Sequence, residues 1–284
     1  MNTTSSPADA ATQALPWLSR RLGAGKPLIM GVLNVTPDSF SDGGRFLDPE
    51  RALAQAERMV AEGADIIDVG AESTRPYGGA VRVSADDELA RLAPILARVV
   101  ALGVPVSIDT LKAEVAAWAL DTGATIVNDV WGLQRDAGMA PLVAARNVPV
   151  IMMHNRDAAD PALDIMADIA AFFSRSLAIA ERAGIARDQM ALDPGIGFGK
   201  TPEQSVTAIA RFAELKAFGL PLLIGASRKR FIDKISPAPP DRRLGGSIAA
   251  HLAAVAAGAA IVRTHDVAET IQALRVQAAI GSVR

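Results

Sequence analysis

The sequence predicts an α/β protein whose single domain is a (β/α)8 TIM barrel with a short N-terminal extension. Along the 284 residues, short apolar runs rich in β-branched side chains alternate eight times with longer amphipathic stretches. The short runs are apolar almost without interruption, as expected of parallel strands that are covered on both faces. A barrel of eight such units takes about 250 residues, which this chain supplies.

The eight predicted strands are spaced so that a helix fits after each of them. They are Leu28–Val35, Ala64–Gly70, Val104–Asp109, Thr125–Val130, Val148–His154, Met190–Asp193, Pro221–Gly225 and Ala260–Arg263. An open, doubly wound parallel sheet is the alternative fold, because a strand count from a single sequence can be wrong.

Amphipathic helices are predicted between these strands and after the last one. Pro49–Gly63 and Asp86–Gly103 place apolar side chains three and four positions apart and end in glycine, which is typical of a helix and its C-terminal cap. The final helix is predicted over Val267–Ile280. Residues 26–284 are therefore expected to form the barrel, and residues 1–25 an extension that is loosely held at its start.

The composition narrows the chemistry and the partners. The chain has no cysteine, which excludes disulfides, thiolate catalysis and zinc–thiolate sites and permits a reducing cytoplasm. A net charge of -2 indicates neither a nucleic acid nor a membrane surface as a partner. The N-terminal segment lacks the pattern of a secretory signal, and no apolar run reaches the roughly 18 residues of a membrane helix. We expect a cytoplasmic protein.

Polar residues follow every predicted strand. In a barrel, the C-terminal ends of the strands and the loops after them form the reaction face. The residues at these ends are Asn34, Glu72–Arg75, Asp109, Asn128, Asp129, His154, Asp193, Ser227–Lys229, Arg263 and His265. One polar strand end is ordinary, but eight of them with side chains that can bind ligands predict one shared pocket.

The segment DPGIGFGKT, Asp193–Thr201, matches a nucleotide phosphate loop only at its end. A phosphate loop needs a glycine five residues before Gly199, and that position holds Pro194, which has no N–H to donate. The dinucleotide fingerprint fails as well, because Lys200 stands where its third glycine belongs. A flexible glycine-rich loop beside Asp193 is the prediction.

Two aspartates end apolar strands and are candidates for ligand binding. Asp109 has an alternative role as a helix cap, which is common for Asp between a strand and a helix. Asp193 is followed by Pro194 and Gly195 rather than by a helix, which argues against capping there. A carboxylate in a partly dry pocket needs partners, and a flat ligand edge with two adjacent N–H donors would supply them.

Cations at the ends of strands 2, 7 and 8 are candidates for anion binding. Arg75, Lys229, Arg263 and His265 each have the alternative of being solvated surface charge. The ends of strands 7 and 8 are, however, a frequent phosphate site in barrels, and strands 1, 2 and 8 become neighbours when a barrel closes. Asn34 offers an amide oxygen of the kind that Mg²⁺ accepts when phosphates and waters fill its other positions.

The three histidines do not predict a zinc site. His154 is expected to be a hydrogen-bonded residue at the rim of the barrel, and His251 lies within a helical pattern and is expected to be structural. No HExxH sequence and no cysteine accompany them. No Gly-x-Ser-x-Gly segment is present either, so serine acyl transfer has no support.

Seven segments together resemble the dihydropteroate synthase family, in order and in spacing. They are GVLNVTPDSFSDGG, GAESTRP, SIDT, IVNDV, LDPGIGFGKT, GASRKRFI and IVRTHDV, spread over residues 27–275. The resemblance implies a (β/α)8 barrel, a homodimer and a transferase of folate biosynthesis. It further implies a reaction that joins p-aminobenzoate to 6-hydroxymethyl-7,8-dihydropterin pyrophosphate and releases pyrophosphate with the help of Mg²⁺.

The resemblance also implies a role for each residue that matches a motif. The implied catalytic set is Arg75, Asp109, Lys229, Arg263 and His265, and the substrate-binding set contains Thr74, Arg75, Pro76, Asp109, Asn128, Asp193, Phe198, Gly225, Ser227, Lys229, Arg263 and His265. Asn34 is expected at the metal. Asp109, Asn128, Asp193 and Lys229 are expected around the pterin, Thr74 and Arg75 near the pyrophosphate and the amine, Arg263 and His265 at the pyrophosphate, and Ser227 at the aminobenzoate carboxylate.

These residue types suit the implied chemistry. If C–O cleavage runs ahead of amine attack, positive charge spreads into the pterin, and Asp109 can stabilise it. Mg²⁺, Arg263 and His265 would stabilise the leaving anion. An aromatic amine is a free base at neutral pH, so no Ser–His pair is needed to activate it. The long polar loops after strands 1 and 2 would then be covers that exclude water.

Two departures and two alternatives accompany the resemblance. Ser205 stands where the family commonly has Asn, and the segment after His154 diverges, so no site residue is carried over from it. One alternative is a pterin-binding barrel of the methyltetrahydrofolate–corrinoid methyltransferase type, which shares the ring site but not the pyrophosphate site. The other is a paralogue that binds pterin without turnover.

Overall fold

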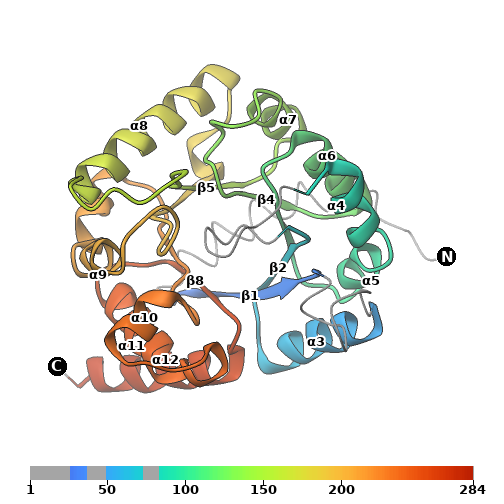
Figure 1. Cartoon of the computed structure of the whole chain (residues 1–284). Helices are drawn as coiled ribbons and strands as arrows, with labels where there is room; N and C mark the ends of the chain where they lie inside the picture. The colour runs from blue at the N-terminus through green and yellow to red at the C-terminus, as the bar shows by residue number, and fades with distance from the viewer. Residues whose placement is uncertain (1–25, 37–48, 73–82, 284) are drawn as a thin grey trace.

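A computed structural model describes residues 26–36, 49–72 and 83–283, and in these residues eight parallel strands are ringed by helices (Figure 1). The strands are β1 (Leu28–Asn34), β2 (Ile66–Gly70), β3 (Val106–Asp109), β4 (Ile126–Asp129), β5 (Val150–Met153), β6 (Met190–Asp193), β7 (Leu223–Ile224) and β8 (Ile261–Thr264). Each strand lies within a predicted strand, apart from one added residue at the end of β8.

The sheet closes into a barrel. Its strands follow the order β6-β5-β4-β3-β2-β1-β8-β7, all parallel. A parallel bridge between Leu192 and Leu222, with the N–H of Leu192 donating to the carbonyl of Pro221, joins β6 to the residues just before β7. An open sheet would leave those two edges unpaired, so the predicted barrel is confirmed.

The helices lie outside the strands and cover them (Figure 1). They are α3 (Pro49–Glu62), α4 (Ala85–Leu92), α5 (Leu96–Val100), α6 (Ala113–Thr122), α7 (Met139–Arg146), α8 (Ile165–Ala183), α9 (Pro202–Ala210), α10 (Arg230–Ile235), α11 (Leu244–Ala256) and α12 (Val267–Gly281). Short 3-10 helices are η1 (Arg187–Gln189), η2 (Phe212–Phe218) and η3 (Pro240–Arg242). Among the described residues, none of these helices combines the length and apolar character needed to cross a membrane.

One predicted helix is broken in two. The amphipathic pattern over residues 86–103 continues through Pro94, but α4 ends at Leu92 and α5 begins at Leu96. Proline has no N–H to donate to the carbonyl four residues earlier, and its ring clashes with that carbonyl. Both halves keep their apolar faces inward, because Leu92 and Leu96 are fully buried.

The inside of the barrel is apolar at one end and polar at the other. One buried cluster contains residues from seven of the strands: Leu28, Met30, Ile66, Ile126, Ile151, Ala191, Leu223 and Ile261. Side chains two positions apart on a strand share a face. The next inward positions toward the strand ends are therefore those of Asp68, Asn128, Asp193 and Arg263, which lie two residues after Ile66, Ile126, Ala191 and Ile261. The apolar layer closes the floor and leaves the polar layer at the mouth.

Candidate active site at the barrel mouth

Arg263 on β8 is at the centre of a buried ionic network. Its Nε lies 2.6 Å from Oδ2 of Asp68, and its Nη2 lies 2.8 Å from Oδ2 of Asp109. The amide of Asn128 donates to the same Oδ2 of Asp68 at 3.1 Å. These four residues come from β8, β2, β3 and β4, so closure of the barrel is what assembles them.

Two glycines keep side chains out of this network. A Cβ on Gly225 would lie 3.9 Å from both the Arg263 side chain and Oδ2 of Asp193. A Cβ on Gly70 would lie 3.3 Å from Cβ of Asp109, the residue that it faces across the β2–β3 pair. The absence of these side chains leaves Asp109, Asp193 and Arg263 facing a common space.

The carboxylates of this network carry acceptor atoms without a protein partner. Oδ1 of Asp68 and Oδ1 of Asp109 are buried, and no described residue donates a hydrogen bond to either atom. Burial raises the pKa of Asp109 to about 7; Arg263 opposes this shift, and Asp68 adds to it. A buried acceptor without a donor is costly, so Asp109 is poised to accept a hydrogen bond or a positive charge from a ligand.

Asp193 at the end of β6 is buried beside this network. Its Oδ1 accepts a hydrogen bond from the N–H of Gly195 at 2.7 Å. Burial raises the pKa of Asp193, and the Gly195 N–H and the nearby Lys229 and Arg263 oppose that rise. The ammonium of Lys229 lies 3.9 Å from the ring centroid of Phe198, a cation–π contact that holds the lysine near the same carboxylate.

The segment Ser227–Lys229 after β7, here called the SRK segment, is held in a strained conformation. Arg228 has φ 58°, a left-handed conformation that side chains other than glycine seldom adopt. Its N–H donates to Oγ of Ser247 at 2.9 Å, and its guanidinium forms two bonds with Asp266, at 3.2 and 2.5 Å. These contacts fix the turn that presents Ser227 on one side and Lys229 on the other.

Comparison with known proteins shows the family to which this chain belongs. A family model described as pterin binding enzyme matches residues 30–265. The dihydropteroate synthase of Bacillus subtilis (strain 168) is 44% identical over 243 residues, which are 85% of this chain and 84% of that protein. The chain belongs to the dihydropteroate synthase family.

Two solved structures agree with this assignment. The Xanthomonas albilineans dihydropteroate synthase with 4-aminobenzoic acid has a TM-score of 0.86 and 42% identity, covering 91% of this chain and 94% of that one. The same enzyme in complex with 7,8-dihydropteroate has a TM-score of 0.82 and 41% identity, covering 91% and 95%. The family, the barrel and the dihydropteroate synthase activity in folate biosynthesis predicted from the sequence are confirmed. The corrinoid methyltransferase alternative receives no support.

The structure brings most of the predicted site residues to one end of the barrel. Asp109 accepts a hydrogen bond directly from Arg263, and Asn128 is connected to Arg263 through Asp68. Further contacts place Asp193, Phe198, Gly225 and Lys229 beside them. Asn34 is the last residue of β1 and lies half-buried opposite Gly70. Thr74, Arg75, Pro76 and most of the polar loop after β1 lie outside the described residues.

Some polar strand ends do not belong to the site. Asp129 accepts hydrogen bonds from the backbone N–H groups of Trp131 and Leu133, at 2.8 and 2.7 Å, and so stabilises the turn after β4. Asp109 does not cap a helix, because α6 begins at Ala113 with Lys112 as its N-cap residue. The capping alternative for Asp109 is therefore wrong.

His154 and Ser205 have the structural roles that the sequence suggested. Both ring nitrogens of His154 are hydrogen-bonded, to Asp168 and Lys200, as expected of a rim histidine. Ser205 is buried, and its hydroxyl donates to the carbonyl of Thr201 within the first turn of α9. Ser205 thus stabilises the start of α9, and the effect of its difference from the family stays a prediction.

Sequence reasoning missed Asp68. It lies inside β2 between Ile67 and Val69, where the run was counted as an apolar strand. The available signal was the carboxylate itself, because a lone Asp within a buried strand needs a buried cation to be tolerated. That cation, Arg263, is distant in sequence and becomes a neighbour only in the closed barrel.

Proposed function

We propose that this chain condenses 6-hydroxymethyl-7,8-dihydropterin pyrophosphate with p-aminobenzoate at the barrel mouth, and that Asp193 and Asp109 grip the pterin. The observation that carries this proposal is the pair of buried carboxylates, Asp109 and Asp193, beside Arg263; Oδ1 of Asp109 has no donor among the described residues. A pterin edge offers the 2-amino group and a ring N–H to such acceptors. One Xanthomonas albilineans structure contains 4-aminobenzoic acid, a substrate of this reaction, and another contains 7,8-dihydropteroate, its product, which supports the proposal.

The pterin is held by residues of β3, β4 and β6 and by the SRK segment. The remaining acceptor positions of Asp193 receive the amino group and ring N–H of the pterin. Asn128, which bonds to Asp68, presents its amide at the same level of the barrel. Phe198 and the Lys229 ammonium above its ring form the wall beside the heterocycle. Gly225 leaves the space that the ring requires.

Asp109 stabilises the positive charge that develops as the C–O bond breaks. Its raised pKa means that the carboxyl group is partly protonated near neutral pH when no ligand is present. A cationic pterin beside it favours the ionised form, because an opposite charge lowers a carboxyl pKa. Arg263 keeps the carboxylate oriented through its bond to Oδ2, which leaves Oδ1 for the ligand.

The leaving pyrophosphate is bound at the rim by Arg263 and His265, with Arg75 added from the segment outside the described residues. The Nδ1 atom of His265 lies 3.0 Å from Oγ of Ser227, and its backbone N–H donates to the same oxygen at 3.2 Å. Ser227 therefore positions the imidazole. The contact of Ser227 with the aminobenzoate carboxylate stays a prediction, since the Ser227 hydroxyl is already hydrogen-bonded to His265.

Asn34 suits a magnesium ion that arrives with the substrate. An amide oxygen is a hard ligand, and among the described residues no three His, Cys, Asp or Glu side chains gather into a metal site. A single amide ligand suits a cation whose other positions are filled by phosphate oxygens and water. When bound, Mg²⁺ would neutralise charge on the pyrophosphate.

We further propose that the chain is a cytoplasmic homodimer. The outer face of α12 exposes Val276 and Ile280, which are 54% and 62% accessible. Together with Leu252 of α11, these two side chains line a groove between the two helices. A contiguous apolar surface of this kind is typical of an interface. Sedimentation equilibrium should show a dimer for the native chain and a monomer for Ile280→Glu, and a native monomer would contradict the proposal.

The test of the proposed function combines turnover with one substitution and a matched control. Native protein given the pterin pyrophosphate, Mg²⁺ and p-aminobenzoate should form dihydropteroate. Asp193→Asn replaces an acceptor with a donor and should weaken pterin binding about 100-fold, the loss of two charge-assisted hydrogen bonds. Asp129→Asn changes another buried strand-end carboxylate, which binds only a turn, and should leave pterin affinity unchanged. Native affinity in Asp193→Asn would contradict the assignment.

A further inference from the structure

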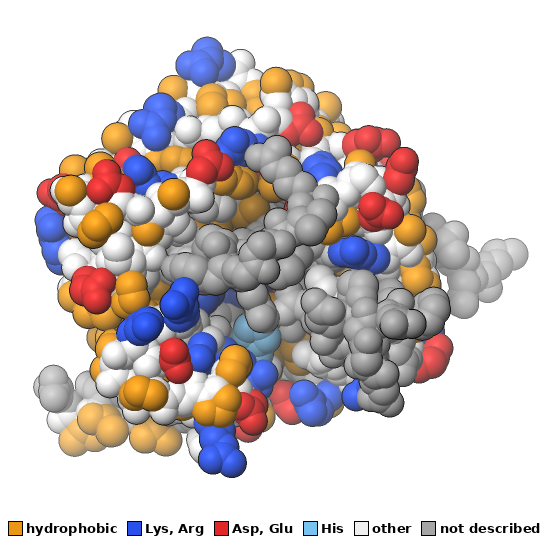
Figure 2. Space-filling view, viewed as in Figure 1, with side chains coloured by type: hydrophobic (Ala, Val, Ile, Leu, Met, Phe, Trp, Pro, Cys, Tyr) orange, Lys and Arg blue, Asp and Glu red, His pale blue; other side chains and the backbone are white. Residues whose placement is uncertain are grey.

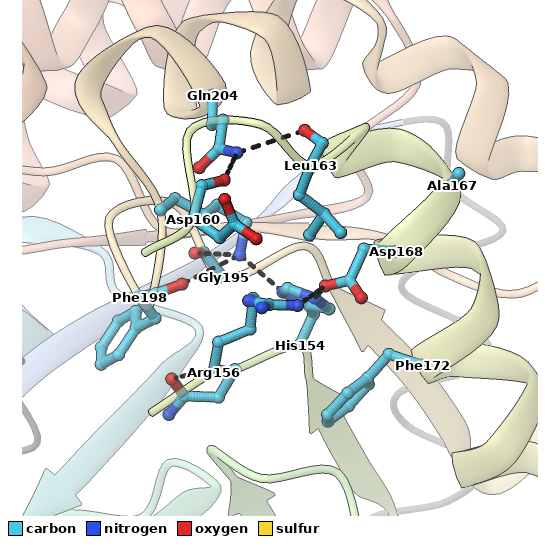
Figure 3. A network of polar contacts seen from close by, with 12 residues as sticks. His154, Arg156, Asp160, Leu163, Ala167, Asp168, Phe172, Gly195, Phe198 and Gln204 are labelled. Carbon is cyan, nitrogen blue, oxygen red and sulfur yellow. Dashed lines mark hydrogen bonds and ion pairs between the residues drawn. The ribbon is translucent and has the colours of Figure 1, made fainter. Parts of the chain in front are cut away.

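Lys200, at the end of the glycine-rich loop after β6, is a buried lysine that the proposed reaction does not use. It is 1% exposed. Its Nζ lies 2.6 Å from Nδ1 of His154, 2.9 Å from the carbonyl oxygen of Gly195 and 3.1 Å from that of Phe198. Figure 3 labels these three partner residues. An ammonium has three hydrogens, and each of these three acceptors matches one of them.

The contacts of Lys200 fit one protonation state of the cluster, in which the lysine is an ammonium. Because Nδ1 of His154 accepts from the lysine, the imidazole proton is on Nε2, which lies 2.9 Å from Oδ2 of Asp168. Arg156 donates to the same carboxylate oxygen at 2.9 Å. Burial lowers the pKa of His154 to about 3 and that of Lys200 to about 7. A neutral amine has two hydrogens, so only the ammonium form satisfies all three acceptors.

Lys200 cannot bind the phosphates of a ligand in this conformation. Its three N–H groups point to acceptors inside the protein, and almost none of its surface reaches solvent. The positive charges at the barrel mouth belong to other side chains. Figure 2 shows Lys and Arg side chains gathered over α10 on the face seen in Figure 1.

The loop that Lys200 holds is pressed against the segment after β5. Gly195 and Gly199 have φ of +65° and +54°. A Cβ on Gly195 would lie 1.9 Å from the carbonyl oxygen of His154, and one on Gly199 would lie 2.3 Å from Cβ of Arg156. Only glycine allows this close approach, and the approach is what brings the loop carbonyls within reach of the buried ammonium.

Both carbonyls bound by Lys200 belong to residues that also contact the pterin site. Gly195 uses its N–H to bind Oδ1 of Asp193 and its carbonyl to bind Lys200. Phe198 uses its carbonyl to bind Lys200 and its ring to hold the ammonium of Lys229. Lys200 is thus connected to Asp193 through Gly195 and to Lys229 through Phe198, and both Asp193 and Lys229 are assigned to the pterin.

We propose that Lys200 is a positioning residue for the pterin site: its buried ammonium, anchored on His154, holds the Gly195–Phe198 turn so that Asp193 and Lys229 face the ligand together. This inference rests on the proposed function. It assigns to Lys200 an effect on pterin affinity that is separate from the binding of pyrophosphate at the rim.

The test measures the affinity for two ligands in two variants of Lys200 and in one stability control. Lys200→Met removes the three donors and keeps the length of the side chain, and Lys200→Gln restores two donors without charge. We expect Lys200→Met to raise the dissociation constant for 6-hydroxymethyl-7,8-dihydropterin pyrophosphate about ten-fold more than that for inorganic pyrophosphate. Lys200→Gln should lie between Lys200→Met and the native protein.

A stability control separates positioning from a general loss of structure. Leu96→Ala creates a cavity under α5, where Leu96 is fully buried, and should destabilise the barrel without changing the ratio of the two affinities. Nitrogen NMR of the His154 ring gives a direct signature, because Nδ1 loses its donor in Lys200→Met. The resulting change in the chemical shift of Nδ1 should be absent in Leu96→Ala.

Three outcomes decide the proposal. A ten-fold selective loss of pterin affinity in Lys200→Met, partly restored in Lys200→Gln, supports it. Equal loss of both ligands, as from a cavity, overturns it, and so does native pterin affinity with a changed His154 signal. If Lys200→Met does not fold, the selectivity of Lys200→Gln decides in the same way. Native protein that binds no pterin would instead refute the proposed function.

Discussion

Arg263 and Lys200 are two buried cations at the mouth of the same barrel, and their surroundings differ in charge. The Arg263 side chain is 16% exposed and lies between the carboxylates of Asp68 and Asp109. Lys200 is 1% exposed and bonds to one neutral imidazole and two backbone carbonyls. Arg263 is therefore stabilised mainly by opposite charges, and Lys200 mainly by hydrogen bonds to neutral acceptors.

This difference shifts the two pKa values in opposite directions. Burial alone lowers the pKa of Arg263, but Asp68 and Asp109 outweigh it, so that this pKa is raised. Burial lowers the pKa of Lys200 to about 7, and the attraction of Asp193 and Asp168 offsets only part of that shift. A cation among carboxylates stays charged for a ligand, whereas a cation among neutral acceptors organises the backbone.

The largest effect is expected from removing Arg263. Arg263→Met leaves Asp68 and Asp109 buried without their counter-charge, which should lower the free energy of unfolding by about 3–5 kcal/mol and abolish turnover. Urea unfolding and a product assay measure the two losses. Exposed Arg211→Met, which breaks the surface pair with Glu214, is the control and should leave the free energy of unfolding nearly unchanged. An equally small loss in Arg263→Met would contradict the comparison.

Removing Lys200 should cost less, because the three hydrogen-bond acceptors described for its ammonium are neutral. Lys200→Met removes the lysine donor from the Phe198 carbonyl and from Nδ1 of His154, and it leaves the Gly195 carbonyl with only the N–H of Phe198. We expect a loss of about 2 kcal/mol in the free energy of unfolding. The same urea series measures it beside Arg263→Met. If Lys200→Met proved the more destabilising of the two, charge would not be what distinguishes the two centres.

The rate should depend on the protonation of Asp109, the partner of Arg263. Since burial raises the pKa of Asp109 to about 7, the ionised fraction falls as the pH drops below 7. If the carboxylate is required, kcat/KM should fall about ten-fold per pH unit below that value. Asp129, whose pKa burial raises to about 6, is the control: Asp129→Asn should leave the midpoint in place. A flat profile from pH 8 to 5.5 would contradict the role of Asp109.

The smallest effect concerns His154, the anchor of Lys200. Its folded-state pKa is lowered by burial and by Lys200, so the unfolded chain takes up a proton at acidic pH that the folded chain does not. The contribution of His154 to the free energy of unfolding is therefore fully present above the pKa that this histidine has in the unfolded chain, and it is lost as the pH falls below that value. Between pH 7 and 5.5 we expect a loss of about 1 kcal/mol that His154→Gln does not show. Equal pH dependence in both proteins would contradict this.

The fold was largely legible in the sequence because it depends on local periodicity. Uninterrupted apolar runs predicted the strands, and the spacing of the helical segments required parallel connections. The prediction was wrong where a local break competed with a longer pattern, since Pro94 divides one amphipathic stretch into α4 and α5. The roles assigned to Thr74, Arg75 and Pro76 fall outside the described residues and stay predictions.

The site was only partly legible, for a geometric reason. Asp109, Asp193 and Arg263 were found because they end strands, and the barrel sends strand ends to one face. Asp68 was overlooked because it lies within a strand, and Lys200 because its motif suggested a phosphate loop and then failed that test. The side-chain partners of these residues, Arg263 for Asp68 and His154 for Lys200, are distant along the chain.

By itself, then, the sequence determined the eight repeating units, the polar strand ends and the family to which they belong, because each of these is written in residues that are close together. Only the tertiary structure decided which charges meet. Closure of the barrel set a guanidinium between two carboxylates and buried an ammonium against a neutral ring, and the free energy of a buried charge depends on the groups within a few ångströms of it, wherever they lie in the chain.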